Sequence, residues 1–229
     1  MSRARAKPAP TENSEADRRA EILRAAIEVF ASKGYHGCRI ADVAKQAGVA
    51  YGLVYHYFKN KEELLESVFS ASFGRFAHAI DKLVEGDGSA SAMLERIVDF
   101  AFDAYLADPR AVKVLIFEIV RSPAFREAAK VSAMQHAMEA TARLVAKGQK
   151  SGELRDDVAP FVAASILFGA VETALTAFVL GAVSSAEGVA KVKRDLLAVY
   201  LQGMSPPQGA PLPRGYKAEH RENGRRAAR

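Results

Sequence analysis

The stretch RIADVAKQAGVAYGLVYHYFKNK, residues 39–61, decides the fold of this chain. Gly48 divides the stretch, and a glycine ends a helix well because it adopts the left-handed conformation without a Cβ clash. Four apolar residues share one helical face before the glycine, and three more form a second face after it. We therefore expect two short helices, at about 39–47 and 50–56, joined by a tight turn. The apolar residues are Ile40, Val43, Ala44 and Ala47, and then Val49, Val54 and Phe58.

The second short helix carries polar and aromatic residues that a buried helix does not need. Tyr51, Tyr55 and His56 cannot all share the face of Val54 and Phe58, so part of their ring surface must be exposed or must meet a partner. A helix-turn-helix places its second helix in the DNA major groove, and this segment has the length, the turn and the exposed chemistry for that task. The other interpretation is an ordinary helical protein with two short helices around a glycine.

The beginnings of the two short helices lack the usual capping residues. Cys38 and Ala50 stand where Ser or Thr would accept hydrogen bonds from the first backbone N–H groups. Those N–H groups either point at a phosphate or leave the helices slightly less stable.

Seven further stretches have helical periodicity, and no strand pattern or internal repeat stands out. We therefore expect an all-α fold of nine helices. The helix at about 15–33 should pack its apolar face on the two short helices and form a three-helix head. The run at 157–181 is long enough to suggest a membrane span, but Glu172 and the lack of flanking basic anchors argue against one. The other expected helices lie at about 62–85, 89–107, 109–121, 123–150 and 186–202.

The net charge of +5 is distributed unevenly. Residues 1–19 carry +2, residues 20–61 carry +3, residues 62–202 carry −4 and residues 203–229 carry +4. Basic regions attract DNA phosphates, whereas the acidic middle argues against a protein that coats DNA along its whole length. We expect a disordered basic arm (1–14), a helix-turn-helix domain (15–61), a ligand-binding and dimerisation domain (62–202) and a disordered basic tail (203–229). The arm either reaches the DNA or only keeps the protein soluble.

Motifs for catalysis, metal binding and secretion are not apparent. The sequence has no phosphate-binding loop, no HExxH and no GxSxG, and its five histidines are scattered. We expect neither enzymatic activity nor a bound metal or cofactor. The single cysteine, Cys38, excludes an intrachain disulfide, and the first 19 residues lack the apolar core of a signal peptide. Both features fit a cytoplasmic protein.

Aromatic and methionine side chains in the stretch 89–181 either form the core or line an apolar pocket. A charged residue within an apolar run must be paired or must meet a ligand. Arg121 either pairs with Glu118, three residues earlier, or binds an anionic group of a ligand. The candidate pocket residues are Phe100, Tyr105, Phe117, Glu118, Arg121, Phe125, Met134, Met138, Phe168 and Glu172.

The last two expected helices are candidates for a subunit interface. The run at 157–181 contains Gly169, Ala170, Ala174 and Ala177, and such small residues allow helices to pack closely. A helix that is buried against its own domain and also against a second subunit explains this composition. With the helix at 186–202 it would form a four-helix interface across a two-fold axis, which predicts a homodimer.

Residues 22–65, ILRAAIEVFASKGYHGCRIADVAKQAGVAYGLVYHYFKNKEELL, resemble the TetR family of transcriptional regulators. The turn glycine, the aromatic cluster, Lys-Asn-Lys and the acidic helix start occur in the family's order. Residues 113–127 and 148–181 resemble, more loosely, members that regulate fatty-acid metabolism and sense long-chain acyl-CoA. The resemblance implies a repressor that binds a near-palindromic double-stranded DNA operator as a dimer and is released by a small hydrophobic effector. Acyl-CoA is one such effector. The alternatives are a regulator of efflux or stress genes that senses another hydrophobic compound, and a helical adaptor without a DNA role.

The resemblance also implies roles for single residues in the helix-turn-helix. The base-facing residues would be Tyr51, Gly52 and Leu53. The phosphate-binding residues would be Tyr55, Tyr57 and Lys61, with Arg39 at the DNA backbone and His56 at either a base or a phosphate. The family usually has Ser or Thr at the positions of Cys38 and Ala50, so those hydroxyls are missing here and Ala50 has only its backbone N–H group to offer.

Overall fold

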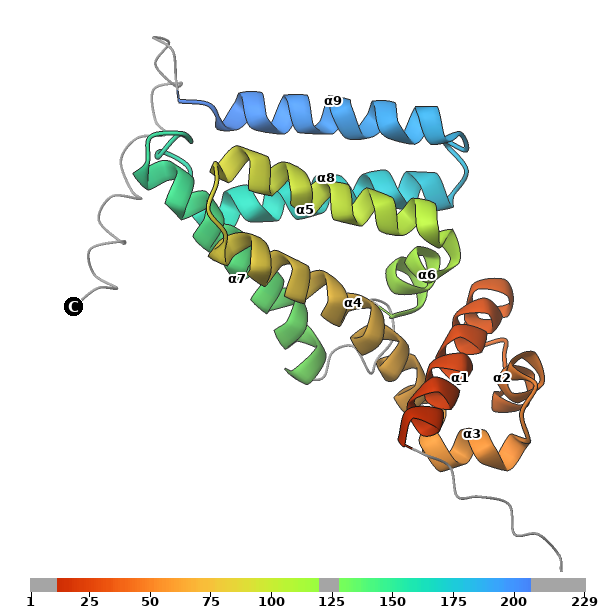
Figure 1. The fold of residues 1–229 in the computed structure, drawn as a ribbon. Helices are drawn as coiled ribbons and strands as arrows, with labels where there is room; N and C mark the ends of the chain where they lie inside the picture. Colours follow the sequence, from red (N-terminus) through yellow and green to blue (C-terminus); the bar gives the residue numbers. More distant parts are fainter. Residues whose placement is uncertain (1–11, 120–127, 207–229) are drawn as a thin grey trace, which may run out of the picture. The chain divides into compact units, whose positions relative to one another are not determined.

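The computed structural model describes residues 12–119 and 128–206, and all of its regular elements are helices (Figure 1). The expected all-α class is therefore confirmed for the described residues. The chain divides into two compact units. The head unit comprises Met1–Ser72 and Lys113–Arg126, and the body unit comprises Phe73–Val112 and Glu127–Arg229. The expected boundary at residue 61 differs from this division because α4 (Lys61–Glu85) starts in the head unit and continues into the body unit.

The head unit is built on α1 (Glu12–Lys33), α2 (Ile40–Ala47) and α3 (Tyr51–Tyr57). Helix α2 contacts both α1 and α3, as the apolar faces in the sequence predict (Figure 1). Helix α1 begins at Glu12, two to three residues earlier than expected, so the last residues of the expected arm (1–14) belong to this helix. The side chains that fill this core are Ile22, Phe30, Val43, Val54, Phe58 and Leu64, all 6% exposed or less.

The turn between α2 and α3 has the predicted glycine conformation. Gly48 has a φ of 65°, in the left-handed region, and its N–H donates to the carbonyl oxygen of Lys45 at 3.2 Å. The next N–H, of Val49, donates to the carbonyl oxygen of Ala44 at 3.0 Å. These bonds satisfy carbonyl groups that the end of a helix leaves open, so Gly48 both ends α2 and sets the direction of α3.

The capping of α2 differs from the prediction. The N-cap is Arg39, whereas Cys38 is buried and its Sγ donates to the carbonyl oxygen of Tyr35 at 3.3 Å. The carboxylate of Asp42 accepts a hydrogen bond from the Arg39 N–H at 2.8 Å. The prediction that Cys38 occupies the capping position was wrong because the helix starts one residue later. Ala50 is the N-cap of α3 and makes no side-chain cap, as predicted.

The body unit surrounds α5 (Ala90–Ala107), which contacts α7 (Ala128–Lys150), α8 (Pro160–Val179) and α9 (Ala186–Met204). Helices α8 and α9 contact each other and run side by side (Figure 1). Helix α9 continues to Met204, past the predicted start of the tail at residue 203. The innermost side chains include Leu94, Val98, Phe102, Leu144 and Leu167, none more than 1% exposed.

Three side chains hold the body unit together over long sequence distances. The Glu153 carboxylate accepts hydrogen bonds from the N–H groups of Ala90 and Ser91, each at 2.7 Å, and so caps the start of α5. The Lys193 ammonium on α9 lies 2.6 Å from the Asp99 carboxylate on α5. The buried Tyr200 hydroxyl on α9 donates to a carbonyl oxygen of α8 at 3.0 Å. These contacts fix α5, α8 and α9 against one another.

The expected helix at 109–121 is two different elements. Helix α6 (Pro109–Lys113) is followed by a π-helix, η1 (Val114–Ile119), which contacts α1 in the head unit. The Lys113 ammonium donates to the carbonyl oxygen of Ala31, near the end of α1, at 2.7 Å. The π-helix was not predicted because this run is apolar on nearly all sides. Without alternating apolar and polar residues, the sequence does not show whether the helix has 3.6 residues per turn or more.

Helix α8 leaves much of its apolar surface open. Pro160–Val179 is long and apolar enough to cross a membrane by length and composition alone, and 22% of its most apolar 18-residue window is buried. The exposed side chains include Phe161 at 53%, Val162 at 48% and Ile166 at 56%. Exposed apolar patches are typical of interaction sites, so this side of α8 is a candidate contact surface.

Candidate nucleic-acid interface and effector site

The outer side of α3 presents the residues that were predicted to read DNA. Tyr51 is 53% exposed and Tyr55 is 43% exposed, whereas Val54, on the opposite side of the same helix, is fully buried. His56 is also exposed, and Leu53 and Tyr57 are half-buried. A Cβ atom added at Gly52 would meet no atom within 4 Å, so the backbone there lies open to an incoming ligand. The inward packing of Val54 thus turns the polar side of α3 outward.

Tyr51 and Tyr55 form a pair on this surface. They are four residues apart, and their hydroxyl oxygens lie 3.2 Å from each other. Their rings meet edge to face, with centroids 5.1 Å apart. The hydrogen bond with Tyr51 raises the pKa of the Tyr55 hydroxyl. This edge-to-face contact is a favourable aromatic arrangement and brings the two hydroxyls side by side in the protein without DNA.

Lys61 contacts the protein itself. Its ammonium donates to the carbonyl oxygens of Tyr35 at 2.7 Å and of Cys38 at 3.0 Å, and lies 4.4 Å from the centroid of the Tyr35 ring. An ammonium group has three N–H bonds, so one remains for another acceptor. Lys61 therefore joins the start of α4 to the connection between α1 and α2, a role that its spacing in the sequence did not indicate.

Tyr35 and Glu62 complete this junction. The Tyr35 hydroxyl donates to the Glu62 carboxylate at 2.8 Å. This hydrogen bond lowers the pKa of Glu62, while burial and the same carboxylate raise the pKa of the Tyr35 phenol. At neutral pH the pair is thus a neutral phenol that donates to a carboxylate. Neither residue was predicted as part of the site, since they are 27 residues apart in the chain.

Side-chain hydrogen bonds also hold the connection from α3 to α4. The Asn60 side chain accepts from the Glu63 N–H at 2.7 Å, and the Glu63 carboxylate accepts from the Lys59 N–H at 2.7 Å. This reciprocal arrangement caps the start of α4. The position of α3 is therefore fixed on one side by the Gly48 turn and on the other by the start of α4.

In the body unit, four phenylalanines from three helices form an aromatic cluster. Phe76 of α4 has its ring centroid 5.5 Å from that of Phe73, 5.6 Å from that of Phe100 and 6.0 Å from that of Phe168. Phe73, Phe76 and Phe168 are half-buried, and Phe100 is 37% exposed. The structure thus brings the predicted pocket residues Phe100 and Phe168 to one place. Phe76, which lies between them, was missed because its spacing on α4 also fits an ordinary core stripe.

The other predicted pocket residues are dispersed. Tyr105 packs on Phe178, with centroids 5.3 Å apart, and Glu172 is exposed on α8. Met134 and Met138 are half-buried on α7, and Phe117 is half-buried on η1 in the head unit. Arg121 and Phe125 lie outside the described residues, as does the side chain of Glu118. The possible pair between Arg121 and Glu118 therefore stays a prediction.

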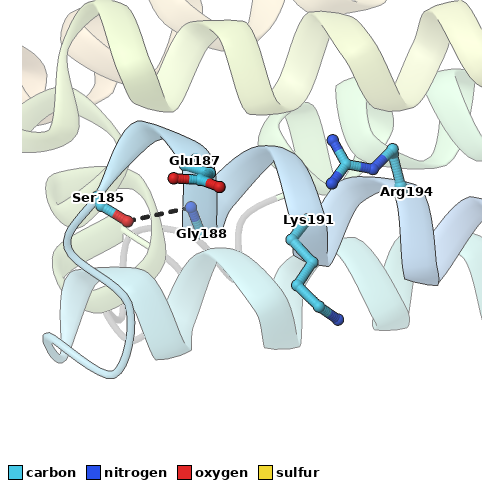
Figure 2. A pocket seen from close by; sticks show the side chains of 5 residues that line it. All are labelled: Ser185, Glu187, Gly188, Lys191 and Arg194. Carbon is cyan, nitrogen blue, oxygen red and sulfur yellow. Dashed lines mark hydrogen bonds between the residues drawn. The ribbon is translucent and has the colours of Figure 1, made fainter.

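Two surface cavities lie on α8, α9 and their connections. One, of about 600 Å³, has an apolar lining that includes Ile166, Ala170, Leu196 and Val199. The other, of about 270 Å³, surrounds the start of α9, where the Ser185 hydroxyl accepts from the Gly188 N–H beside Glu187, Lys191 and Arg194 (Figure 2). Neither cavity is lined by the predicted effector residues. Ile166 belongs both to the lining of the first cavity and to the exposed apolar side of α8. We use the name α8–α9 face for the surface formed by Phe161, Val162, Ile166, Ala170, Leu196 and Val199.

Comparison with known proteins identifies the family. The family described as bacterial regulatory proteins, tetR family, matches residues 22–68, and the tetracyclin repressor-like C-terminal domain matches residues 91–180. The fatty acid metabolism regulator protein of Bacillus subtilis is 28% identical over 160 residues, which cover 70% of this chain and 82% of that protein. The HTH-type transcriptional repressor NicS of Pseudomonas putida is 31% identical over 147 residues, which cover 63% of this chain and 69% of that protein.

Solved structures agree with this assignment. The transcriptional regulator FadR from Bacillus subtilis, in complex with stearoyl-CoA, superimposes with a TM-score of 0.73 at 25% identity, covering 81% of this chain and 98% of that chain. FadR from Bacillus halodurans superimposes with a TM-score of 0.75 at 24% identity, covering 88% and 100%, which supports the fold. This chain belongs to the TetR family. It is a DNA-binding transcriptional regulator of the ligand-responsive repressor class and not an enzyme.

Proposed function

We propose that this protein is a cytoplasmic, homodimeric repressor whose two α3 helices enter successive major grooves of a near-palindromic operator. The observation that carries the proposal is the exposed Tyr51–Tyr55 pair on a helix that is held from behind by the buried residues Val54 and Phe58. A helix whose inner face is fixed and whose outer face is polar and open is suited to read base edges. Membership of the TetR family supports the same function.

Contacts to bases and contacts to phosphates would come from different residues. Tyr51, Gly52 and Leu53 would face base edges, with the open backbone at Gly52 allowing close approach. Arg39 and Tyr55 would contact phosphates, together with Tyr57, the remaining N–H bond of Lys61 and the backbone N–H of Ala50. His56 is placed to meet either a base or a phosphate. Because base contacts specify and phosphate contacts position, these two groups should respond differently to substitution.

The α8–α9 face would hold the second subunit. Its exposed residues Phe161, Val162, Ile166 and Val199 would otherwise remain in water, at a cost of roughly 25 cal/mol per Å² of apolar surface. A two-fold axis brings the same surface of each subunit together, so one apolar face is sufficient for both. Dimerisation of TetR-family regulators supports this arrangement, which would give each operator half-site its own α3 helix.

The effector would bind among the helices of the body unit, on the aromatic cluster of Phe73, Phe76, Phe100 and Phe168. Half-buried aromatic rings from three helices offer an apolar surface to a hydrocarbon chain. The similarity to a regulator solved with stearoyl-CoA favours a long-chain acyl-CoA. Arg121 is the candidate partner for an anionic group of that effector. A different hydrophobic compound is the second candidate, because relatives of this chain also include a regulator named for ketosteroids.

The effector would act by shifting a population of conformations. A ligand changes an equilibrium only when it binds one state better than the other. Helix α4 is continuous from Lys61 to Glu85, with its first part in the head unit and its last part, which carries Phe76, in the body unit. An effector that contacts Phe76 would therefore contact the same helix that Lys61 joins to the DNA-binding head.

Gel-shift titration tests this function, with DNA from around the gene as probe and palmitoyl-CoA as the trial effector. We expect specific binding at low micromolar protein or below, weaker binding as salt rises, and release by palmitoyl-CoA. Free CoA and palmitate serve as controls for the two parts of the effector, and a ketosteroid tests the second candidate. Failure to bind any DNA specifically would overturn the repressor function, whereas specific binding that palmitoyl-CoA leaves unchanged would overturn only the choice of effector.

A further inference from the structure

The hydroxyl groups of Tyr51 and Tyr55 are linked to each other, and this link restricts what each can offer to DNA. Their oxygens are 3.2 Å apart, and both rings face solvent. A phenol has one hydrogen to donate. When two phenols share a hydrogen bond, one of them donates its only hydrogen to the other and keeps only lone pairs for any further partner.

A phosphate group determines the direction of that bond. Phosphate oxygens at neutral pH only accept hydrogen bonds, so a tyrosine that binds phosphate must donate its hydrogen to it. In the proposed function Tyr55 contacts a phosphate. The Tyr55 hydrogen then points at the phosphate, and the bond between the two tyrosines must use the hydrogen of Tyr51.

We propose that Tyr51 is a specificity-determining residue that accepts a hydrogen bond from an adenine or cytosine amino group, with its polarity set by Tyr55. This inference rests on the proposed function. In the major groove, the N6 amino group of adenine and the N4 amino group of cytosine are the hydrogen-bond donors, whereas guanine and thymine present acceptors. A Tyr51 oxygen that has only lone pairs left can accept a hydrogen bond from the amino group of adenine or cytosine. It cannot donate one to the acceptor atoms of guanine or thymine.

Two further properties of the pair support this relay. The edge-to-face packing of the rings, at 5.1 Å, holds the two hydroxyls together without help from DNA. The Tyr55 hydroxyl also keeps its hydrogen at neutral pH, as a phenol with the ordinary pKa of about 10 does, so it can donate to a phosphate. A lone tyrosine on α3 would rotate its hydroxyl freely and would accept or donate equally well, so it would discriminate less between bases.

The test uses the full-length protein and the operator that it selects from random DNA. At each operator position, adenine is replaced by purine or cytosine by 2-pyrimidinone, which removes only the amino group from the major groove. For the wild type, we expect one position in each half-site where this removal weakens binding by about three- to tenfold, the effect of one hydrogen bond. Tyr51→Phe should show no such loss at that position and should bind the unmodified operator about three- to tenfold more weakly.

Tyr55→Phe distinguishes the relay from two independent contacts. It should weaken binding to every sequence, because the phosphate contact is lost, and it should also reduce discrimination at the Tyr51 position, because the Tyr51 hydrogen is released. Tyr57→Phe is the matched control on the same helix, and it should weaken all sequences equally while leaving discrimination intact.

Two results would overturn the inference. One is unchanged base discrimination in Tyr51→Phe. The other is unchanged discrimination at the Tyr51 position in Tyr55→Phe, since Tyr55 would then not set the polarity of Tyr51. In both cases specific binding by the wild type would leave the proposed function standing, whereas a wild-type protein that selects no sequence at all would overturn both.

Discussion

The ammonium nitrogen of Lys61 lies 2.7 Å from the carbonyl oxygen of Tyr35, which joins the first residue of α4 to the connection between α1 and α2. The residues are 26 positions apart, so this hydrogen bond closes the head unit around α2 and α3. In the proposed function Lys61 also contacts a phosphate, so its contributions to stability and to DNA binding can be separated by substitution.

Lys61→Met should destabilise the head unit. It keeps most of the aliphatic stem and removes two hydrogen bonds from a charged donor, and we expect a loss of about 1–3 kcal/mol in the free energy of unfolding. Urea denaturation followed by circular dichroism measures the effect, which is convenient because the chain has no tryptophan. The control is Lys59→Met at an exposed position nearby, which should change stability by less than about 0.5 kcal/mol. If Lys61→Met is as stable as the wild type but binds DNA more weakly, Lys61 contributes to phosphate binding and not to the stability of the head unit.

Glu153→Gln should make the body unit less sensitive to acid. Burial raises the pKa of the Glu153 carboxyl, but hydrogen bonds from Ser91 and Ala90 lower it more, and the net pKa is below its usual range. A depressed pKa contributes stability that is present above the unfolded pKa of about 4.3 and is lost as the pH falls through the folded pKa. We expect the variant to be less stable than the wild type at pH 7 by about 1 kcal/mol, with a difference that shrinks below about pH 4. Urea midpoints across this pH range provide the measurement, and a difference that grows with acid would contradict the assignment.

Tyr200→Phe should weaken the contact between α8 and α9. It removes the buried hydrogen bond to the Ala163 carbonyl oxygen, and we expect a loss of about 1 kcal/mol and a drop in Tm of roughly 2–4 °C. Burial raises the pKa of Tyr200 to about 12. The stability from this group is therefore complete below the unfolded pKa of about 10 and is lost as the pH rises toward the folded value. Thermal unfolding of both proteins between pH 7 and 11 checks this, and an equal alkaline decline in the two would exclude Tyr200 as its source.

Val199→Glu and Ile166→Glu should convert the dimer into a monomer. Both residues are exposed on the α8–α9 face, and a charge there would be buried without a partner at the subunit interface. Sedimentation velocity should give twice the chain mass of 24.7 kDa for the wild type and the single mass for the variants. Leu106→Glu is the control, since Leu106 is also an exposed aliphatic residue, 48% accessible, but belongs to α5 and does not line the apolar cavity on α8 and α9. A monomeric wild type would contradict the dimer. A dimer in both test variants with a monomer in Leu106→Glu would place the subunit interface elsewhere.

The arrangement of α2 and α3 was predictable because its determinants are local. The buried faces of Ile40 and Val43 repeat at helical spacing, and Gly48 marks the left-handed turn without reference to any other part of the chain. The one-residue error at Cys38 arose because the signal for an N-cap is weak when neither Ser, Thr, Asn nor Asp is present. Asp42 supplies a compensating contact to Arg39 that follows from the capping pattern only once the true start of α2 is known.

Other features were not predictable because they depend on contacts across long sequence distances. No local sequence pattern predicts the hydrogen bond between Lys61 and Tyr35 or the one between Glu153 and Ala90. Each bond forms only when the helices pack. The place of Phe76 in the aromatic cluster was not predictable for the same reason, because Phe100 and Phe168 belong to other helices. Periodicity shows which face of a helix is apolar, but it does not show which other faces it meets.

The central claim, sequence-specific DNA binding by a dimer through α3, is tested most directly by fluorescence anisotropy with the selected operator and a scrambled duplex. The account predicts that the full-length dimer binds the operator at least about a thousandfold more tightly than the scrambled duplex, with both affinities falling as salt rises. Equal affinity for the two duplexes at every salt concentration would contradict it.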